Sequence, residues 1–318
     1  MNVPMKAMVQ GFFGLLLALA LAALNAAAQT PPAPTFETGF TSVETFQGEL
    51  NSTDRLFKLD SNFGYDFTRH FGVFAGVPLY FGSVSQTPAP VTGATATTGA
   101  NNGASNGIGN VYLGFGLRFP AKVLNYASTV TAGAPTGSTK NGLSSGRASV
   151  DWSNRFEFSA GSFTPFVEAG LANTVPDTSR VTRAFTSLGT VSHFEEGAEY
   201  QASRYVAVGA SGYHVVPFGN QKVFSKVSNS GKGNGGGTTT PAATNSGKGK
   251  HGVFQDQFFA SGTGLTQENG VSTWLALQPE KGFWRIETGY TRSVTYALNS
   301  FTFSLGLNVG KMMRARKG

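Results

Sequence analysis

The chain contains no cysteine among its 318 residues, and charged residues make up only 13% of it. Without cysteine the protein has neither disulfide bonds nor thiolate metal ligands, so its stability must come from an ordinary core or a closed hydrogen-bonded ladder. The charged share is about half of the usual value, as expected where many side chains face lipid. After residue 28, no stretch approaches about 18 consecutive apolar residues, which excludes a protein that crosses a membrane with helices.

A two-sided pattern repeats along most of the remaining sequence. Its segments alternate apolar side chains with small or polar ones, and the segment at 300–309 is the clearest, with Thr302 between Phe301 and Phe303. Side chains of a strand point alternately to opposite faces, so each segment predicts a strand with one apolar and one polar face. Segments of about ten residues with this alternation are typical of a transmembrane β-barrel.

The N-terminus carries the features of an export signal. Lys6 supplies a positive charge, residues 12–24 form a short apolar run, and small residues follow. This arrangement predicts a signal peptide, residues 1–28, that is cleaved after export, followed by a Pro-rich linker over 29–35. A retained signal anchor is the alternative, but the apolar run is short for a membrane span. We therefore expect an exported protein of the bacterial outer membrane.

The sequence predicts an all-β fold, an antiparallel transmembrane barrel of twelve strands over residues 36–310. The candidate strands are 36–47, 55–67, 71–82, 109–119, 126–134, 148–160, 162–173, 189–201, 204–216, 270–278, 283–294 and 300–309. Every second connection is short and those between are mostly long, as in bacterial barrels with short periplasmic turns and long external loops. A β-sandwich has no reason to sort its loops in this way. Ten strands is the alternative, because the segments around Phe40 and Trp274 alternate poorly.

Two of the predicted external loops, 83–108 and 218–269, contain low-complexity sequence. Their Gly-, Thr- and Asn-rich stretches lack the apolar residues needed to offset the entropy of ordering, so we expect both loops to be disordered. The second loop contains a cluster of lysines that either binds anionic cell-surface polymers or keeps a solvated linker soluble. A basic C-terminal tail follows over 311–318. Basic residues are not interleaved with aromatics, so nucleic acid is not an expected partner.

Charged side chains on the polar faces are expected to point into the barrel, because an Arg or Lys that faces lipid near the midplane costs about 2–4 kcal/mol. The predicted pore-lining residues are Lys58, Asp60, Asp66, Arg118, Asp151, Arg155, Glu157, Glu168, His193, Glu195, Glu199, Arg285 and Glu287. Eight of these are carboxylates and four are fixed cations, which predicts a slightly cation-preferring interior. The alternative is a salt-bridge network that plugs the lumen. Glu196 falls on the apolar face of its segment, which indicates a β-bulge or a position at the membrane interface.

Motifs for catalysis, cofactors and metals are nearly absent. The segment 133–140 resembles a phosphate-binding loop only superficially, because no Ser or Thr follows Lys140 and no helix is expected after it. The four histidines are scattered over different segments, so no metal site is predicted. Ser211 and His214 share a segment, but their odd spacing puts them on opposite faces, which argues against a hydrolytic dyad. We therefore expect no cofactor and no enzymatic activity.

Three short segments resemble a known family. Residues 107–114, 134–137 and 163–170 are similar to the outer-membrane transporter family associated with the meta-cleavage pathway of phenol degradation. The resemblance covers about 55–216, and it departs from the family at Asn110, where Asp is usual, and at Ala134, where Leu is usual. It implies a barrel that passes small, often hydrophobic molecules across the outer membrane. The chain also continues past Gly310, whereas outer-membrane barrels commonly finish on an aromatic residue.

The sequence thus predicts an outer-membrane channel for the passive uptake of small solutes, among which the resemblance implies hydrophobic or aromatic ones. Its expected partners are outer-membrane lipid and the solute, and no oligomeric state follows from the sequence. Two other functions stay open. One is a non-conducting surface or structural barrel whose long loops bind a partner, and the other is a membrane-embedded lipid-modifying enzyme.

Overall fold

The computed structural model describes residues 39–50, 54–84, 104–139, 143–175, 177, 180, 183, 185–219, 221–225, 267–278, 282–295 and 298–315. The predicted signal peptide (1–28), the linker (29–35), most of the two low-complexity loops and residues 316–318 of the tail lie outside this part of the chain. No helix among the described residues is long and apolar enough to cross a membrane.

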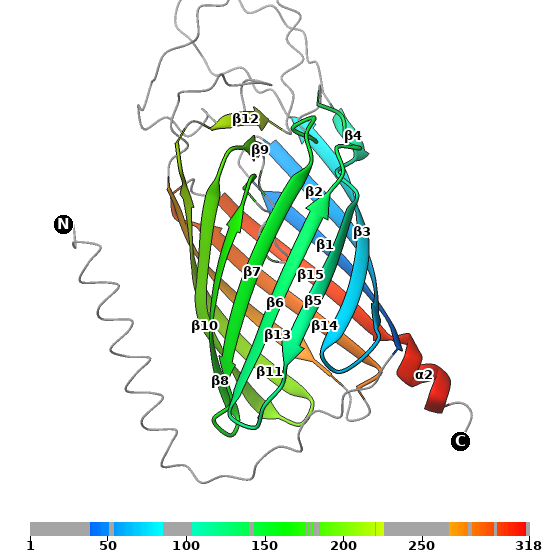
Figure 1. Ribbon diagram of the computed structural model, residues 1–318. Coiled ribbons are helices and arrows are strands. Elements are labelled where there is room, and N and C mark those ends of the chain that lie inside the picture. The colour runs from blue at the N-terminus through cyan, green and yellow to red at the C-terminus, as the bar shows by residue number, and fades with distance from the viewer. Residues whose placement is uncertain are drawn as a thin grey trace, which may run out of the picture.

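The wall of the molecule is one closed antiparallel β-sheet (Figure 1). Its strands are β1 (Gly39–Leu50), β2 (Asp54–Asp66), β3 (Phe71–Val84), β4 (Ala104–Ile108), β5 (Tyr112–Phe119), β6 (Leu124–Gly133), β7 (Ser149–Phe158), β8 (Phe163–Ala172), β10 (Val191–Ser203), β11 (Val206–Pro217), β13 (Glu268–Leu277), β14 (Trp284–Ser293) and β15 (Leu298–Asn308). Apart from β4 and β5, neighbours in this order pair, and β1 also pairs with β15, which closes the barrel. β4 and β5 both pair with β3 and are two parts of one wall strand. This confirms the prediction of twelve strands and excludes ten.

The two segments that alternate poorly in the sequence are regular strands of the barrel. β1 pairs with β2 along its whole length, and β13 pairs with β11 from Glu268 to Leu277. In β13, the large apolar side chain of Trp274 is buried on the inner face, where small or polar side chains were expected, while Leu275 and Leu277 are exposed on the outer face. A single inward tryptophan therefore hides the alternation of this strand.

Parts of the two loops predicted to be disordered form strands instead. Residues 104–108, within the predicted loop 83–108, pair with residues 79–83 of β3. Residues 222–225, within the predicted loop 218–269, form β12 (Lys222–Ser225), which pairs with β9 (Phe185–Leu188) in a separate two-stranded sheet. The same loop prediction also included Glu268, which is the first residue of β13. Such short paired segments are stabilised by distant partners, which the composition of the surrounding sequence does not reveal.

The connections are sorted by length between the two ends of the barrel, as predicted. The short turns that join β2 to β3, β5 to β6, β7 to β8, β10 to β11 and β13 to β14 start from strand ends at the lower end in Figure 1, and most of the strands that meet the upper end are separated by longer stretches of sequence. The chain also enters and leaves the wall at the lower end, since Thr41 of β1 pairs with Asn308 of β15. The short helix α2 (Val309–Ala315) follows β15 there and lies outside the wall.

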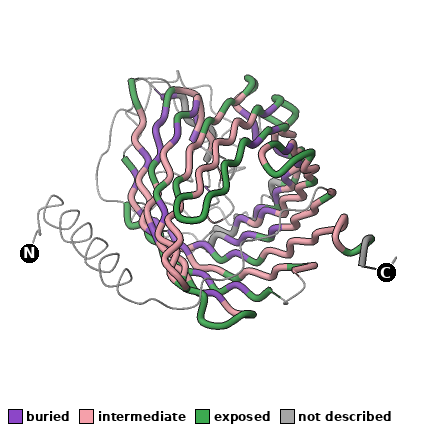
Figure 2. The backbone as a smooth tube through the Cα atoms, turned by 60° about the horizontal axis from the view of Figure 1, so that its bottom comes forward, coloured by how far each residue is buried: buried purple, intermediate pink, exposed green. Residues whose placement is uncertain are grey.

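The outer surface of the barrel is apolar and ends in a belt of aromatic rings. Phe301 and Phe303 of β15 are about half exposed on it, whereas Thr302 between them is buried, and Figure 2 shows this alternation around the wall. At the end with the short turns, rings contact one another from strand to strand, with centroid distances of 4.8 Å for Phe40 and Tyr65 and 5.5 Å for Phe67 and Phe71. Such aromatic girdles mark the membrane–water interface of outer-membrane barrels.

Glu196 faces outward from the middle of β10. The prediction of a β-bulge at this residue is wrong, because the pairing of β10 with β11 is unbroken from Val191 to Gln201 and shifts only between Gln201 and Ser203. Its neighbours across the sheet are Val167 and Gly212, and its central position in the strand also argues against the interface. A carboxylate therefore stands on the apolar wall itself.

Candidate functional site

The thirteen residues predicted to line the pore all lie on the inner face of the barrel, and each of them takes part in an ion pair. The pairs are Lys58 with Asp60, Arg118 with Asp66, His193 with Asp151, Arg155 with Glu157 and Glu168, Arg285 with Glu199 and Glu287, and a loop arginine with Glu195. Several pairs join strands that are not neighbours, so only an inward direction lets the side chains meet. Their role as the lining of a pore stays a prediction.

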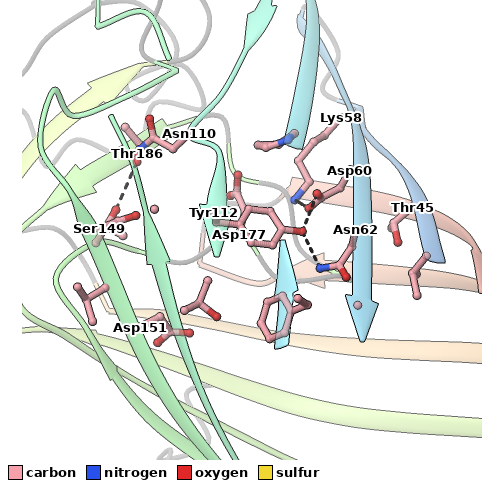
Figure 3. Close-up of a pocket in the computed structure, with 18 of the residues that line it drawn as sticks. Thr45, Lys58, Asp60, Asn62, Asn110, Tyr112, Ser149, Asp151, Asp177 and Thr186 are labelled. Carbon is pink, nitrogen blue, oxygen red and sulfur yellow. Dashed lines mark hydrogen bonds and ion pairs between the residues drawn. The ribbon is translucent and has the colours of Figure 1, made fainter. Parts of the chain in front are cut away.

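One cluster converges on Asp60 of β2 (Figure 3). Lys58 Nζ lies 3.3 Å from Asp60 Oδ2, and the Tyr112 hydroxyl donates to Asp60 Oδ1 at 2.9 Å. Asn62 Nδ2 in turn donates to the Tyr112 oxygen at 3.1 Å. Gly76 of β3 lies beneath the ring of Tyr112, and a Cβ atom there would overlap that ring. The missing side chain at Gly76 therefore lets Tyr112 reach the carboxylate.

Two further pairs lie along the same side of the lumen. Near the short turns, Arg118 approaches Asp66 at 2.9 Å, and its side chain is about half exposed. Across β8, His193 Nε2 lies 2.8 Å from Asp151 Oδ1. The imidazole passes over Gly170 of β8, where a Cβ atom would collide with it. Polar groups thus follow this wall from one end of the barrel to its middle.

A second set of charges lies on the inner face of β7, β8, β10 and β14. Arg155 lies 2.7 Å from Glu157 and 3.5 Å from Glu168, and its guanidinium also stacks on the ring of Phe166 at 3.7 Å. Arg285 lies 3.0 Å from Glu199 and 3.1 Å from Glu287. These side chains neutralise one another in a network, which is the arrangement that the sequence left open as an alternative.

Asp177 and Arg183, from the segment between β8 and β9, lie in the lumen and brace it, which was not predicted. The hydroxyl of Tyr80, on β3, donates to Asp177 at 2.7 Å, and Asp177 also accepts from the backbone N–H of Arg183 at 3.1 Å. Arg183 Nε donates to Glu268 of β13 at 2.7 Å, and Tyr213 of β11 donates to the same carboxylate at 2.8 Å. In the order of strands β3 and β11 lie six steps apart in either direction. The brace, formed by Asp177 and Arg183, therefore crosses the full width of the barrel.

The charge of Arg183 fits its surroundings. Its side chain is 2% exposed and that of Glu268 is 3% exposed. Burial alone would lower the pKa of Arg183, but the adjacent Glu268 carboxylate raises that pKa above its ordinary value. The two groups therefore stay ionised together in the interior, where a charge without a partner would be costly.

Arg180, from the same segment, contacts three further strands of the wall. It lies 3.3 Å from Glu195 and 3.4 Å from Glu287, and its guanidinium stacks on Trp274 with 3.8 Å to the ring centroid. Trp274 Nε1 donates to Glu199 at 2.9 Å, which fixes the indole on the wall. The only signal in the sequence is a pair of arginines in a loop, and it does not reveal their inward direction.

A cavity of about 520 Å³ lies on one side of the barrel. Residues of β1, β2, β3, β5, β6 and β7 line it on one side, and Thr174, Val175, Asp177 and Thr186 line it on the other. It extends along β2 from Asp66, near the short turns, to Lys58, near the long loops. Eight residues of strand correspond to about 26 Å. A cavity of this volume that runs along most of the wall is a narrow, eccentric path lined by polar groups.

Ser211 and His214, the two residues considered for a hydrolytic dyad, lie on opposite faces of the wall. Ser211 is buried on the inner face of β11, where it pairs with Gly197 of β10. His214 lies on the outer face beside Asn269, to which its Nδ1 is hydrogen bonded. The wall separates the two side chains, as their odd spacing predicted.

Comparison with known proteins shows the fold of the chain. No protein-family model and no curated protein matches it. The crystal structure of an outer membrane channel from Pseudomonas putida F1 is similar at a TM-score of 0.52 and 11% sequence identity, and the match covers 88% of this chain and 99% of that one. The NanC porin matches at a TM-score of 0.46 and 6% identity, over 84% of this chain and 98% of that one. The first likeness shows that the chain has the fold of a known outer-membrane channel.

Proposed function

We propose that this protein is an outer-membrane channel through which small solutes diffuse passively. The observation that carries the proposal is the cavity between β1–β7 and the inward loop, which extends along β2 from Asp66 to Lys58. Its small cross-section favours small solutes, and the paired charges on its wall provide a polar path through an apolar layer. The apolar outer face and the aromatic belt support the membrane position, and the predicted signal peptide supplies the route of export.

In this proposal, the thirteen inner-face residues predicted from the sequence line the path and the filled part of the lumen beside it. The inward loop adds one carboxylate, Asp177, and two guanidinium groups, Arg180 and Arg183, while Glu268 of β13 adds a second carboxylate. The excess of carboxylates over fixed cations that the sequence predicted is therefore unchanged. We infer a weak preference for cations among charged solutes. The resemblance to the transporter family of phenol degradation adds small aromatic molecules to the candidate solutes.

A non-conducting structural barrel is the second candidate. The brace through Asp177 and Arg183 and the stack of Arg180 on Trp274 favour it, because they fill much of the interior with rigid, paired groups. Purified protein in planar bilayers separates the two functions. For a channel we expect discrete steps of conductance, and a saturating concentration of a transported solute should reduce them. A membrane that stays sealed at every applied voltage would instead favour the structural role.

A further inference from the structure

The helix α2 lies outside the sheet that forms the wall of the barrel. It begins directly after β15 and projects outside the ring of strands (Figures 1 and 2). Asn308 caps its first turn, since Oδ1 of this residue accepts a hydrogen bond from the backbone N–H of Lys311 at 2.8 Å. Because an N-cap of this kind favours the helix over the strand, the chain changes conformation at a defined residue.

The helix leaves the wall at the depth of the aromatic belt. Leu307, near the end of β15, pairs with Trp284 of β14, and Asn308 pairs with Thr41, the neighbour of Phe40 in β1. Trp284 and Phe40 are both exposed on the outer surface. Aromatic side chains at this position lie at the level of the lipid headgroups. The first turn of α2 is therefore placed at the membrane surface on the side of the short turns.

The side chains of the helix combine exposed apolar groups with positive charge. Met312 and Met313 are 45% and 61% exposed, which is unusual for two adjacent large apolar residues on an outer surface. From residue 309 to the end of the sequence there are four basic residues, Lys311, Arg314, Arg316 and Lys317, and no acidic one. Apolar side chains next to a run of Lys and Arg are the composition of segments that lie in an anionic membrane interface.

We propose that α2 binds the anionic phospholipid headgroups of the leaflet at the short-turn end, with Met312 and Met313 inserted at the boundary of the acyl chains. The choice of lipid rests on charge complementarity and on the depth at which the helix starts. A protein partner has no such reason to sit at the level of Trp284 and Phe40. The proposal does not depend on whether the barrel conducts.

The absence of cysteine from the sequence makes a single-site probe straightforward. Met313→Cys in the full chain is labelled with an environment-sensitive fluorophore and folded into vesicles of phosphatidylcholine alone or mixed with phosphatidylglycerol. Ser162→Cys, exposed in the turn between β7 and β8 at the same end, is the control. In the mixed vesicles we expect blue-shifted emission and quenching by a lipid-borne nitroxide for the probe at 313, and neither for the probe at 162.

The charges are tested in the same vesicles. Replacement of Lys311, Arg314, Arg316 and Lys317 by Gln, or addition of high salt, is expected to return the emission at 313 toward that of water. Equal exposure of this probe to water in both lipids would overturn the proposal. Equal shielding in both lipids would overturn the recognition of anionic headgroups, and shielding found only in native envelopes would assign the helix to a protein partner instead.

Discussion

Arg180 lies over the indole of Trp274, with its guanidinium carbon 3.8 Å from the ring centroid, and neither side chain belongs to the lining of the cavity. The arginine comes from the loop between β8 and β9, and the tryptophan comes from the wall strand β13. Glu195 and Glu287 neutralise the guanidinium from two other strands. A loop side chain and a wall side chain thus restrict the open path to one side of the barrel.

Arg180→Ala should widen this path. Removal of the guanidinium deletes the stack on Trp274 and leaves Glu195 and Glu287 with one cation fewer, so both single-channel conductance and cation preference are expected to rise. Arg69→Ala, in an exposed turn at the end of the barrel, is the matched control and should leave both unchanged. Bilayer recordings of the two variants measure both quantities. An unaltered conductance in Arg180→Ala would show that solutes do not pass near this residue.

Glu287→Gln should weaken the preference for cations. The variant removes one inner carboxylate but keeps its shape, and a lumen field of this kind is screened by added salt. Under a gradient of KCl, the reversal potential is expected to move toward zero while conductance persists. Glu196→Gln removes one carboxylate from the outer face and serves as the control. If the native protein prefers anions in these recordings, the basic loops rather than the carboxylates of the lumen control the entry of ions.

Gly76→Ala should narrow the cavity, because the added methyl group lies on the wall of the barrel beside Tyr112. The new Cβ atom would overlap the ring of Tyr112, so the ring must move away from Asp60 and into the open space. We expect lower conductance in the folded variant. Gly212→Ala is the counterpart on the outer face, where a Cβ atom has room, and its conductance should equal that of the native protein. The same reduction in both variants would indicate a general effect on the sheet.

Glu268→Gln should destabilise the barrel strongly. The change leaves Arg183 buried without its ionic partner, and breaking a buried pair in this way costs about 3–5 kcal/mol. Glu157→Gln is the comparison, because Glu157 and Arg155 are 35% and 28% exposed, and pairs of that exposure contribute about 0–1 kcal/mol. Urea unfolding of both variants in the same lipid gives the difference. Equal losses would mean that the brace does not contribute to stability.

Phe303→Arg tests the lipid-facing surface. Phe303 lies in the middle of β15 and is half exposed on the outer face, so an arginine there should cost about 2–4 kcal/mol of folding free energy in a bilayer. Ser304→Arg places the same charge on the inner face of the same strand and should cost less. The two unfolding free energies are compared in one vesicle composition, and a larger loss for Ser304→Arg would indicate that the lumen at this depth has no room for a long side chain.

The wall could be predicted from the sequence because alternation is a local property. Phe301, Thr302 and Phe303 carry the information about their faces in their own order, and so do Asp151 and Glu157 in β7. The strand that contains Trp274 was difficult to recognise from the sequence. Its aromatic side chain points inward, whereas apolar side chains of the other strands mostly point outward. The inward loop could not be predicted, because the partners of Asp177 and Arg183 are far away in the sequence and only the closed barrel brings them near.

The brace also has a consequence for the order of folding. Adjacent wall strands meet through short turns at one end, whereas the contact of Tyr80 with Asp177 joins positions 97 residues apart and that of Arg183 with Glu268 joins positions 85 apart. Contacts between such distant positions carry a large loop-closure cost and form late. Asp177 and Arg183 can bridge β3 and β13 only after the sheet has curled enough to bring these two strands opposite each other. The loop thus fastens a sheet that is already curved, and its contacts are expected to form after the pairing of neighbouring strands.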